Sequence, residues 1–145
     1  MNTAKTPWET AREAFAIESD AIARTLEHIP EDAFMKAVEV LKNAPRIAAS
    51  GCGHSGICCM HFAHLMWCIE RSARFISPAE AVHGATGYLK KGDVMLLASR
   101  GGKTAELLPI MDICKKKEAG RACPPDSRAV QNHMVARVVR RAAAR

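Results

Sequence analysis

The sequence lacks the features that mark membrane-spanning and exported proteins. No segment reaches the roughly eighteen apolar residues that a spanning helix needs, and the first nine residues contain no apolar stretch typical of a signal peptide. The six cysteines show no paired spacing, so we expect free thiols. Because spanning and export segments are also missing, we expect no membrane partner and a cytoplasmic location. A chain of 145 residues, 48% of them hydrophobic and 25% charged, allows one globular domain with a modest core.

A basic surface spread over the whole fold is also missing. Residues 1–120 have a net charge of +1, whereas residues 121–145 have a net charge of +5, made by six arginines against Asp126. Nucleic-acid-binding domains concentrate positive charge on one face of the fold. We therefore expect no nucleic-acid partner for the domain, and a nucleic-acid or membrane function is left only to residues 121–145.

Three closely spaced glycines form the most informative motif of the chain. Gly51, Gly53 and Gly56 follow a short apolar segment and precede an apolar-periodic run at residues 57–69. Glycine allows a sharp turn and a close approach to a ligand. Free N–H groups at the start of the following helix bind anions, most often phosphate. The pattern predicts a strand, an anion-binding loop and a helix.

A second loop of this kind begins at Ser99. It follows a buried-strand pattern at residues 94–98 and precedes a helical pattern at residues 107–114. Because open α/β sheets bind ligands at the carboxyl ends of their parallel strands, we expect both loops at one edge. Each loop alone could be an ordinary tight connection. Together they favour a ligand that contains phosphate.

The segment between the loops completes a resemblance to a known family. Residues 77–84 read Ser-Pro-Ala-Glu-Ala-Val-His-Gly, and with both loops they resemble the sugar isomerase (SIS) domain, nearest to arabinose 5-phosphate isomerase-like proteins. The resemblance covers about residues 30–120. It implies a three-layer α/β sandwich with a parallel sheet that binds a phosphorylated sugar, usually as a homo-oligomer. We expect no cofactor and no metal ion.

The chain departs from the family pattern at three positions. His54 stands where these isomerases usually have lysine, Lys103 where they have glutamate, and Gly101 where they have a second serine. Lys103 suits a bound anion or is an ordinary surface lysine. Position by position, the resemblance implies phosphosugar contacts from Gly51, Gly53, Ser55, Ser99, Gly101, Gly102, Lys103 and Thr104.

Aldose–ketose isomerisation requires a base next to a carbonyl and a group that protonates the carbonyl oxygen. His54, Glu80 and His83 lie near the expected mouth of the site, and a helical turn would place Glu80 and His83 on one face. We expect these three residues to be the catalytic groups. The alternative roles are a turn residue for His83 and a helix-start carboxylate for Glu80.

Two functions remain open from the sequence. The first is a phosphosugar-binding SIS domain of an aldose–ketose isomerase lineage. The second is a phosphosugar sensor without catalytic activity, which the replaced lysine and glutamate positions favour. Incubation with aldose phosphates separates them, because only an isomerase exchanges a substrate proton with solvent.

The expected organisation has three parts. Residues 1–45 form two amphipathic helices, at 8–28 and 31–43, that cover the sheet or contact a partner subunit, residues 46–120 form the SIS core, and residues 121–145 form a divergent basic tail. After Gly120 the expected apolar strand is missing, which suggests truncated or out-of-frame coding sequence. A short basic helix capped by Ser127, with Val130, Met134 and Val138 on one face, is predicted instead.

One stripe of possible metal ligands has a simpler explanation. Cys58, His61, His64 and Cys68 share one side of a predicted helix. Four ligands on one straight helix cannot surround a single zinc ion. We expect instead that these residues are packed in the core.

Overall fold

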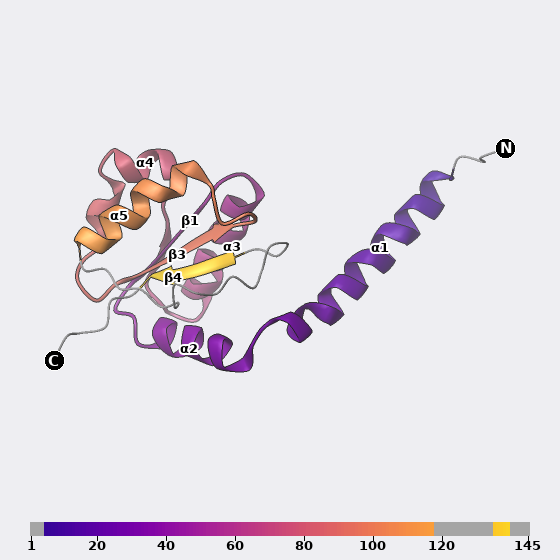
Figure 1. Cartoon of the computed structure of the whole chain (residues 1–145), viewed down its shortest axis with the longest axis horizontal. Coiled ribbons are helices and arrows are strands. Elements are labelled where there is room, and N and C mark those ends of the chain that lie inside the picture. The colour runs from indigo at the N-terminus through magenta and orange to yellow at the C-terminus, as the bar shows by residue number, and fades with distance from the viewer. Residues whose placement is uncertain (1–4, 118–134, 140–145) are drawn as a thin grey trace. The chain divides into compact units, whose positions relative to one another are not determined.

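The computed structural model describes residues 5–117 and 135–139 (Figure 1). The chain divides into two compact units, residues 1–35 and 36–145. No helix within the described ranges is long and apolar enough to cross a membrane.

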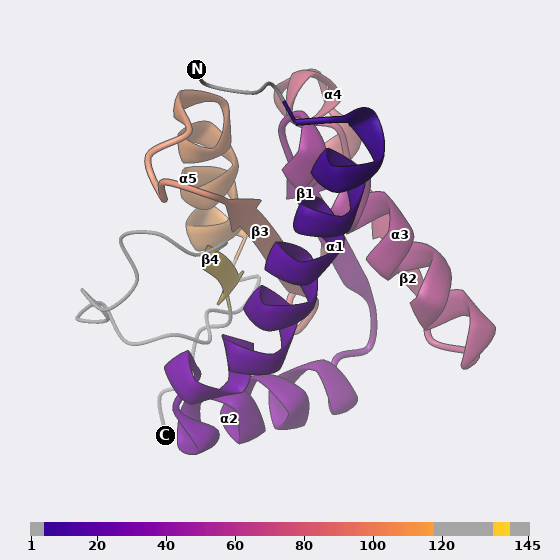
Figure 2. The same cartoon turned by 90° about the vertical axis from the view of Figure 1, so that its right-hand side faces the viewer.

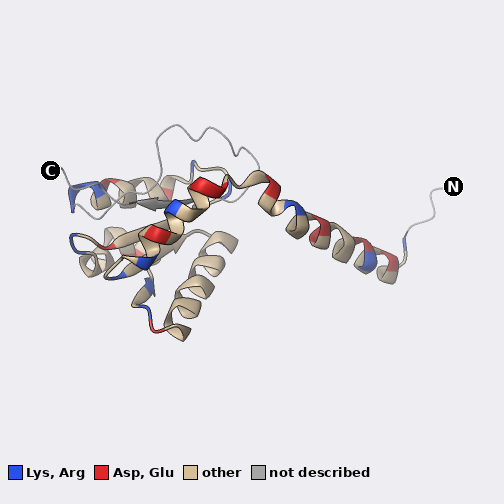
Figure 3. Cartoon of the chain, turned by 90° about the horizontal axis from the view of Figure 1, so that it is seen from below, with Lys and Arg blue, Asp and Glu red and all other residues tan. Residues whose placement is uncertain are grey.

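The first unit is dominated by α1 (Pro7–Arg24), which a 3₁₀ turn, η1 (Thr25–His28), extends. Thr6 caps the helix: its hydroxyl accepts the Glu9 N–H at 3.2 Å, and the Glu9 carboxylate accepts the Thr6 N–H at 2.8 Å. Both acidic and basic residues lie along α1, and the acidic ones are more numerous (Figure 3). Its apolar side chains are exposed, and the largest of them are Trp8, Phe15, Ile17 and Ile22.

The second unit is built on a four-stranded sheet. Its strands are β1 (Ile47–Gly51), β2 (Ala73–Phe75), β3 (Val94–Ser99) and β4 (Val135–Val139), in the spatial order β2-β1-β3-β4. The first three strands are parallel, whereas β4 is antiparallel to β3. The three parallel strands therefore end at the same edge of the sheet.

Helices cover both faces of this sheet (Figures 1 and 2). On one face of the sheet, the core contains residues of α4 (Pro78–Val82) and α5 (Leu108–Lys116). On the other face, it contains residues of α2 (Glu31–Lys42) and α3 (His54–Cys68). Two further 3₁₀ turns, η2 (Ala85–Tyr88) and η3 (Ala105–Leu107), precede β3 and α5. The architecture is the expected three-layer α/β sandwich.

Alternation along the central strands divides the core into two layers. Ala48, Met95 and Leu97 face the α4 and α5 side, where Ile110 and Cys114 are fully buried. Their neighbours Ile47, Ala49, Val94, Leu96 and Ala98 face the other side, where Cys59 and Ala63 of α3 pack. Since successive side chains of a strand point to opposite faces, an apolar residue at every position requires cover on both sides.

Strand β4 corrects the expectation of a terminal helix. Val138 lies in a strand, where it pairs with Leu96 of β3, while Ser127, Val130 and Met134 lie outside the described residues. The outer edge of β3 would otherwise leave backbone groups unpaired, and residues 135–139 pair with it in antiparallel register. The sheet thus acquires a fourth strand, but an antiparallel one.

Candidate functional site

The first loop connects β1 to α3 in a very tight turn. A Cβ atom on Gly51 would lie 2.8 Å from the backbone of Ser55, and one on Gly56 would lie 2.6 Å from the Gly51 carbonyl oxygen. Gly53 adopts φ 54° and ψ −131°, a conformation open mainly to glycine. Gly51 and Gly56 let the end of β1 touch the start of α3. Gly53, which lies between them in the sequence, lets the chain turn.

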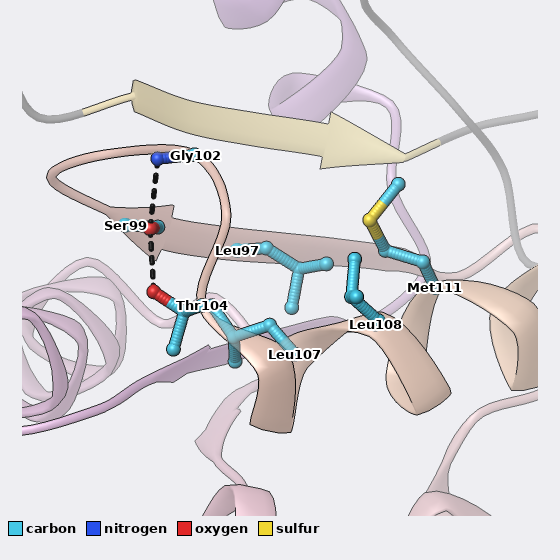
Figure 4. Close-up of a pocket in the computed structure, with 7 residues that line it drawn as sticks. All are labelled: Leu97, Ser99, Gly102, Thr104, Leu107, Leu108 and Met111. Atoms are coloured by element: carbon cyan, nitrogen blue, oxygen red, sulfur yellow. Dashed lines mark hydrogen bonds between the residues drawn. The ribbon is translucent and has the colours of Figure 1, made fainter.

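The second loop, Ser99–Thr104, is closed by its own hydrogen bonds (Figure 4). The hydroxyl oxygens of Ser99 and Thr104 are 2.6 Å apart, and the Gly102 N–H donates to the Ser99 hydroxyl at 3.0 Å. Beneath the loop lies a cavity of only about 20 Å³, lined by Leu97, Ser99, Gly102, Thr104, Leu107, Leu108 and Met111. That space suits a water molecule rather than a phosphate group.

Both loops leave the same edge of the sheet. Gly51 at the end of β1 pairs with Ala98, one residue before the end of β3. Strand β2 ends at this edge too and leads into α4. The sequence-based prediction that the two loops share one carboxyl edge is therefore confirmed.

A larger open cavity, of about 380 Å³, lies beside the first loop. It contains two of the predicted residues, Gly51 and Gly53. The other lining residues are not among the predicted phosphosugar contacts, although Gly56 belongs to the glycine motif and residues 77–79 to the segment that carries the family resemblance; the remaining four are Cys52, Met60, Phe75 and Glu106. Glu106 belongs to η3 and, among the residues that the structure describes, is the only charged one in this lining.

Several predicted residues line neither of these two cavities: Ser55, Gly101, Lys103 and the three catalytic candidates. His54 is exposed at the first position of α3. Glu80 and His83 are exposed at α4, where the His83 N–H donates to the Glu80 carbonyl at 3.0 Å, so they share one turn as predicted. The structure thus places the phosphate-type loops together, whereas the catalytic candidates line neither of the two cavities described for residues 5–117 and 135–139.

Burial raises the pKa of two thiols near this site, those of Cys52 and Cys59. Partial burial raises the pKa of Cys52, and the negative charge of Glu106 raises it further. Burial raises the pKa of Cys59 to about 11. Neither thiol therefore has the thiolate character that a nucleophile needs.

The stripe along α3 differs from the sequence-based expectation. Cys58, His61, His64 and Cys68 are exposed rather than packed in the core, because the buried side of α3 is formed by Gly56, Cys59 and Ala63. In the part of the chain that the structure describes, no three His, Cys, Asp or Glu side chains are placed to hold a metal ion.

The family comparison agrees with the fold and the loops. The model of the SIS domain family matches residues 40–123. Arabinose 5-phosphate isomerase KdsD of Pseudomonas aeruginosa is 33% identical over 108 residues, which are 74% of this chain and 33% of that protein. Arabinose 5-phosphate isomerase GutQ of Shigella flexneri is 32% identical over 99 residues, or 68% of this chain and 30% of that protein.

Solved structures give the same result. A Listeria monocytogenes protein provisionally described as a sugar-phosphate isomerase superposes with a TM-score of 0.74 at 36% identity, covering 79% of this chain and 62% of that one. The Escherichia coli CFT073 protein c3406, solved in complex with a phosphorylated sugar, gives a TM-score of 0.67 at 26% identity, with 78% and 62% covered. The chain spans about one third of the length of the curated relatives.

Proposed function

This chain belongs to the SIS domain family, and we propose on that basis that the chain binds a phosphorylated sugar at the edge of the sheet where its parallel strands end. We propose further that the chain derives from an aldose–ketose isomerase lineage. The observation that carries the proposal is the pair of loops that leave adjacent parallel strands at Gly51 and Ser99. The sugar-phosphate complex of c3406 supports the same class of ligand.

The phosphate is proposed to bind to the second loop outside the small cavity beneath it, which has space for a water molecule only. Ser99 and Thr104 supply hydroxyls, and Gly102 supplies a backbone N–H. Arg100 and Lys103 are exposed on this loop, and neither forms an ion pair within residues 5–117 and 135–139. Two unpaired cations beside three hydrogen-bonding groups favour an anion.

The proposed chemistry moves one proton between neighbouring carbons of the sugar. A base removes the proton next to the aldose carbonyl while an acid protonates the carbonyl oxygen, which gives an enediol. Return of a proton to the former carbonyl carbon, with loss of the other hydroxyl proton, yields the ketose. His54, Glu80 and His83 are the candidate proton carriers, and their exposure requires the bound sugar to reach beyond the cavity beside the first loop.

We also propose that the chain forms a homo-oligomer in the cytoplasm. Its three parts are proposed to be the helical segment 1–45, the SIS core 46–120 and the basic tail 121–145. The exposed apolar side chains of α1, such as Trp8 and Phe15, support contact with a second copy of the chain.

The proposal predicts both binding and exchange. Incubation with arabinose 5-phosphate in deuterium oxide should place deuterium next to the carbonyl, which NMR detects together with any ketose phosphate. Ser99→Ala should weaken binding of the aldose phosphate about tenfold, because it removes a hydroxyl that contacts a charged phosphate. Ser72→Ala, at the opposite edge of the sheet where Ser72 contacts Tyr88, should leave binding unchanged.

The possible results have separate meanings. Equal losses in Ser99→Ala and Ser72→Ala would contradict the phosphate assignment. Binding without deuterium uptake would contradict the isomerase chemistry and leave a phosphosugar-binding domain. Absence of binding to any sugar phosphate would contradict the whole proposal.

A further inference from the structure

The outer side of α3 presents four side chains of the types that bind zinc, and the proposed function uses none of them. We call this set the α3 stripe; its members are Cys58, His61, His64 and Cys68. All four are exposed, and none of their side chains forms a hydrogen bond or ion pair with the residues that the structure describes. Thiolate sulfur and imidazole nitrogen are the ligands of most structural zinc sites. The stripe therefore offers zinc ligands on the protein surface.

One copy of the chain offers two ligand pairs rather than one complete site. The first pair, Cys58 and His61, is spaced by three residues, and the second pair, His64 and Cys68, by four. Side chains at these spacings are neighbours on a helix surface, with Cβ atoms about 5–6 Å apart. A structural zinc site needs four ligands, and within the described ranges no three such side chains are placed to hold one ion. A complete site must therefore take its other ligands from outside this helix.

The order of the ligands makes a second copy of α3 the matching partner. Cys58 and Cys68 each lie five residues from position 63, and the two histidines lie two residues before it and one after it. When two identical helices run antiparallel and cross at that level, the first pair of one copy meets the second pair of the other. A two-fold axis repeats this encounter at the other end of the contact. Two sites result, each with two cysteines and two histidines on facing helices.

The rest of this helix face suits contact with a copy of itself. Residues 54–68 contain no Asp, Glu, Lys or Arg, so two copies meet without charge repulsion. Ile57 and Leu65 lie four residues before and four residues after His61, and are therefore on the same side of the helix. Their side chains are 57% and 45% exposed. Exposed apolar side chains grouped in this way favour a protein–protein contact.

We propose that two copies of the chain bind two structural zinc ions between antiparallel α3 helices. Each site takes the first pair from one copy and the second pair from the other. Each zinc ion displaces the protons of two thiols, and the two thiolates balance the charge of the ion. The proposal is independent of phosphosugar binding, because the α3 stripe includes no residue that lines the two cavities or belongs to the second loop.

Zinc titration of the full chain tests the proposal. The protein is freed of metal with a chelator and kept reduced with a phosphine, which prevents disulfide-linked dimers. It should then take up one Zn²⁺ per chain, and light scattering should show that zinc doubles the mass of the species found without metal. Co²⁺ in place of Zn²⁺ should give the absorption bands of a tetrahedral site with thiolate ligands. Absence of zinc uptake, or zinc held by monomers, would overturn the proposal.

Two double variants test whether the copies share ligands. Cys58→Ser with His61→Ala removes the first pair, whereas His64→Ala with Cys68→Ser removes the second. Each variant alone should lose zinc-dependent assembly, because none of its sites has four ligands. An equimolar mixture should recover dimers that hold one zinc per two chains, because one site of the mixed dimer is complete. Zinc-dependent assembly of either variant alone, or no recovery in the mixture, would refute the antiparallel pairing.

A matched pair of single variants gives the expected size of the effect. His61→Ala should weaken zinc binding by about 100-fold or more, because even the outer partners of metal ligands contribute about 10- to 100-fold. His28→Ala is the control, because His28 is also exposed but lies in η1, outside α3. It should leave zinc affinity unchanged, and urea unfolding should show that both variants remain folded. Equal losses in the two variants would indicate unspecific binding to histidines and overturn the proposal.

Discussion

Replacing Gly56 with alanine is expected to lower the free energy of unfolding by about 3 kcal/mol and to abolish ligand binding at the first loop. The new Cβ would lie 2.6 Å from the Gly51 carbonyl oxygen, a distance that real Cβ atoms essentially never show. The contact is with backbone, so no side-chain rotation relieves it. Relief requires α3 to move away from the end of β1, which separates the loop from its helix. Urea denaturation and calorimetric titration with a sugar phosphate measure the two effects.

Gly101→Ala is the matched control for this substitution. Gly101 lies on the second loop and does not have a positive φ, and a Cβ added there would meet no heavy atom within 4 Å beyond its chain neighbours. We expect its unfolding free energy to change by about 0.5 kcal/mol or less. Equal stability losses for Gly56→Ala and Gly101→Ala would contradict the close strand–helix contact described for Gly51 and Gly56.

Replacing Arg46 with methionine is expected to cost about 3–5 kcal/mol of unfolding free energy. Asp93 is 1% exposed and receives two hydrogen bonds from the Arg46 guanidinium, besides one from the Lys90 N–H at 2.7 Å. Methionine keeps much of the apolar stem but leaves the Asp93 carboxylate buried without a counter-charge. Thermal and urea unfolding measure the loss.

A double substitution separates the charge effect from lost packing. Arg46→Met with Asp93→Asn removes both charges, so we expect it to recover a large part of the stability lost in the single variant. Arg74→Met serves as the control. The guanidinium groups of Arg46 and Arg74 both lie over the Tyr88 ring, at 4.9 Å and 5.8 Å from its centroid, but Arg74 forms no ion pair within the described segments. If the double variant is no more stable than Arg46→Met alone, the buried charge is not the source of the loss.

The sequence carried most of the fold because its local patterns agree with one another. The apolar runs that form β1 and β3 have no polar face, which predicts helices on both sides of the sheet. The helices observed at residues 7–24 and 31–42 begin and end within one or two residues of the bounds predicted from apolar periodicity, except where the 3₁₀ turn replaces the end of the first helix. Strand β4 could not be predicted in the same way. Its pairing depends on the free edge of β3, a property of the assembled sheet rather than of residues 135–139.

The site was predictable only where backbone geometry defines it. Glycine spacing located both loops, since close approach and tight turns require that residue. Ser77 could have been found as the residue before Pro78, at the expected mouth, and Glu106 as an acid two residues after the loop. Which face of η3 points into a cavity depends on the burial of Leu107, and no local pattern in the sequence encodes that choice.

The closed state of the second loop has a thermodynamic consequence. Ser99, Gly102 and Thr104 already satisfy one another, so an incoming phosphate exchanges existing hydrogen bonds for new ones and gains few in number. The net attraction then comes mainly from Arg100 and Lys103, which are exposed. Affinity for sugar phosphates should therefore fall steeply as ionic strength rises.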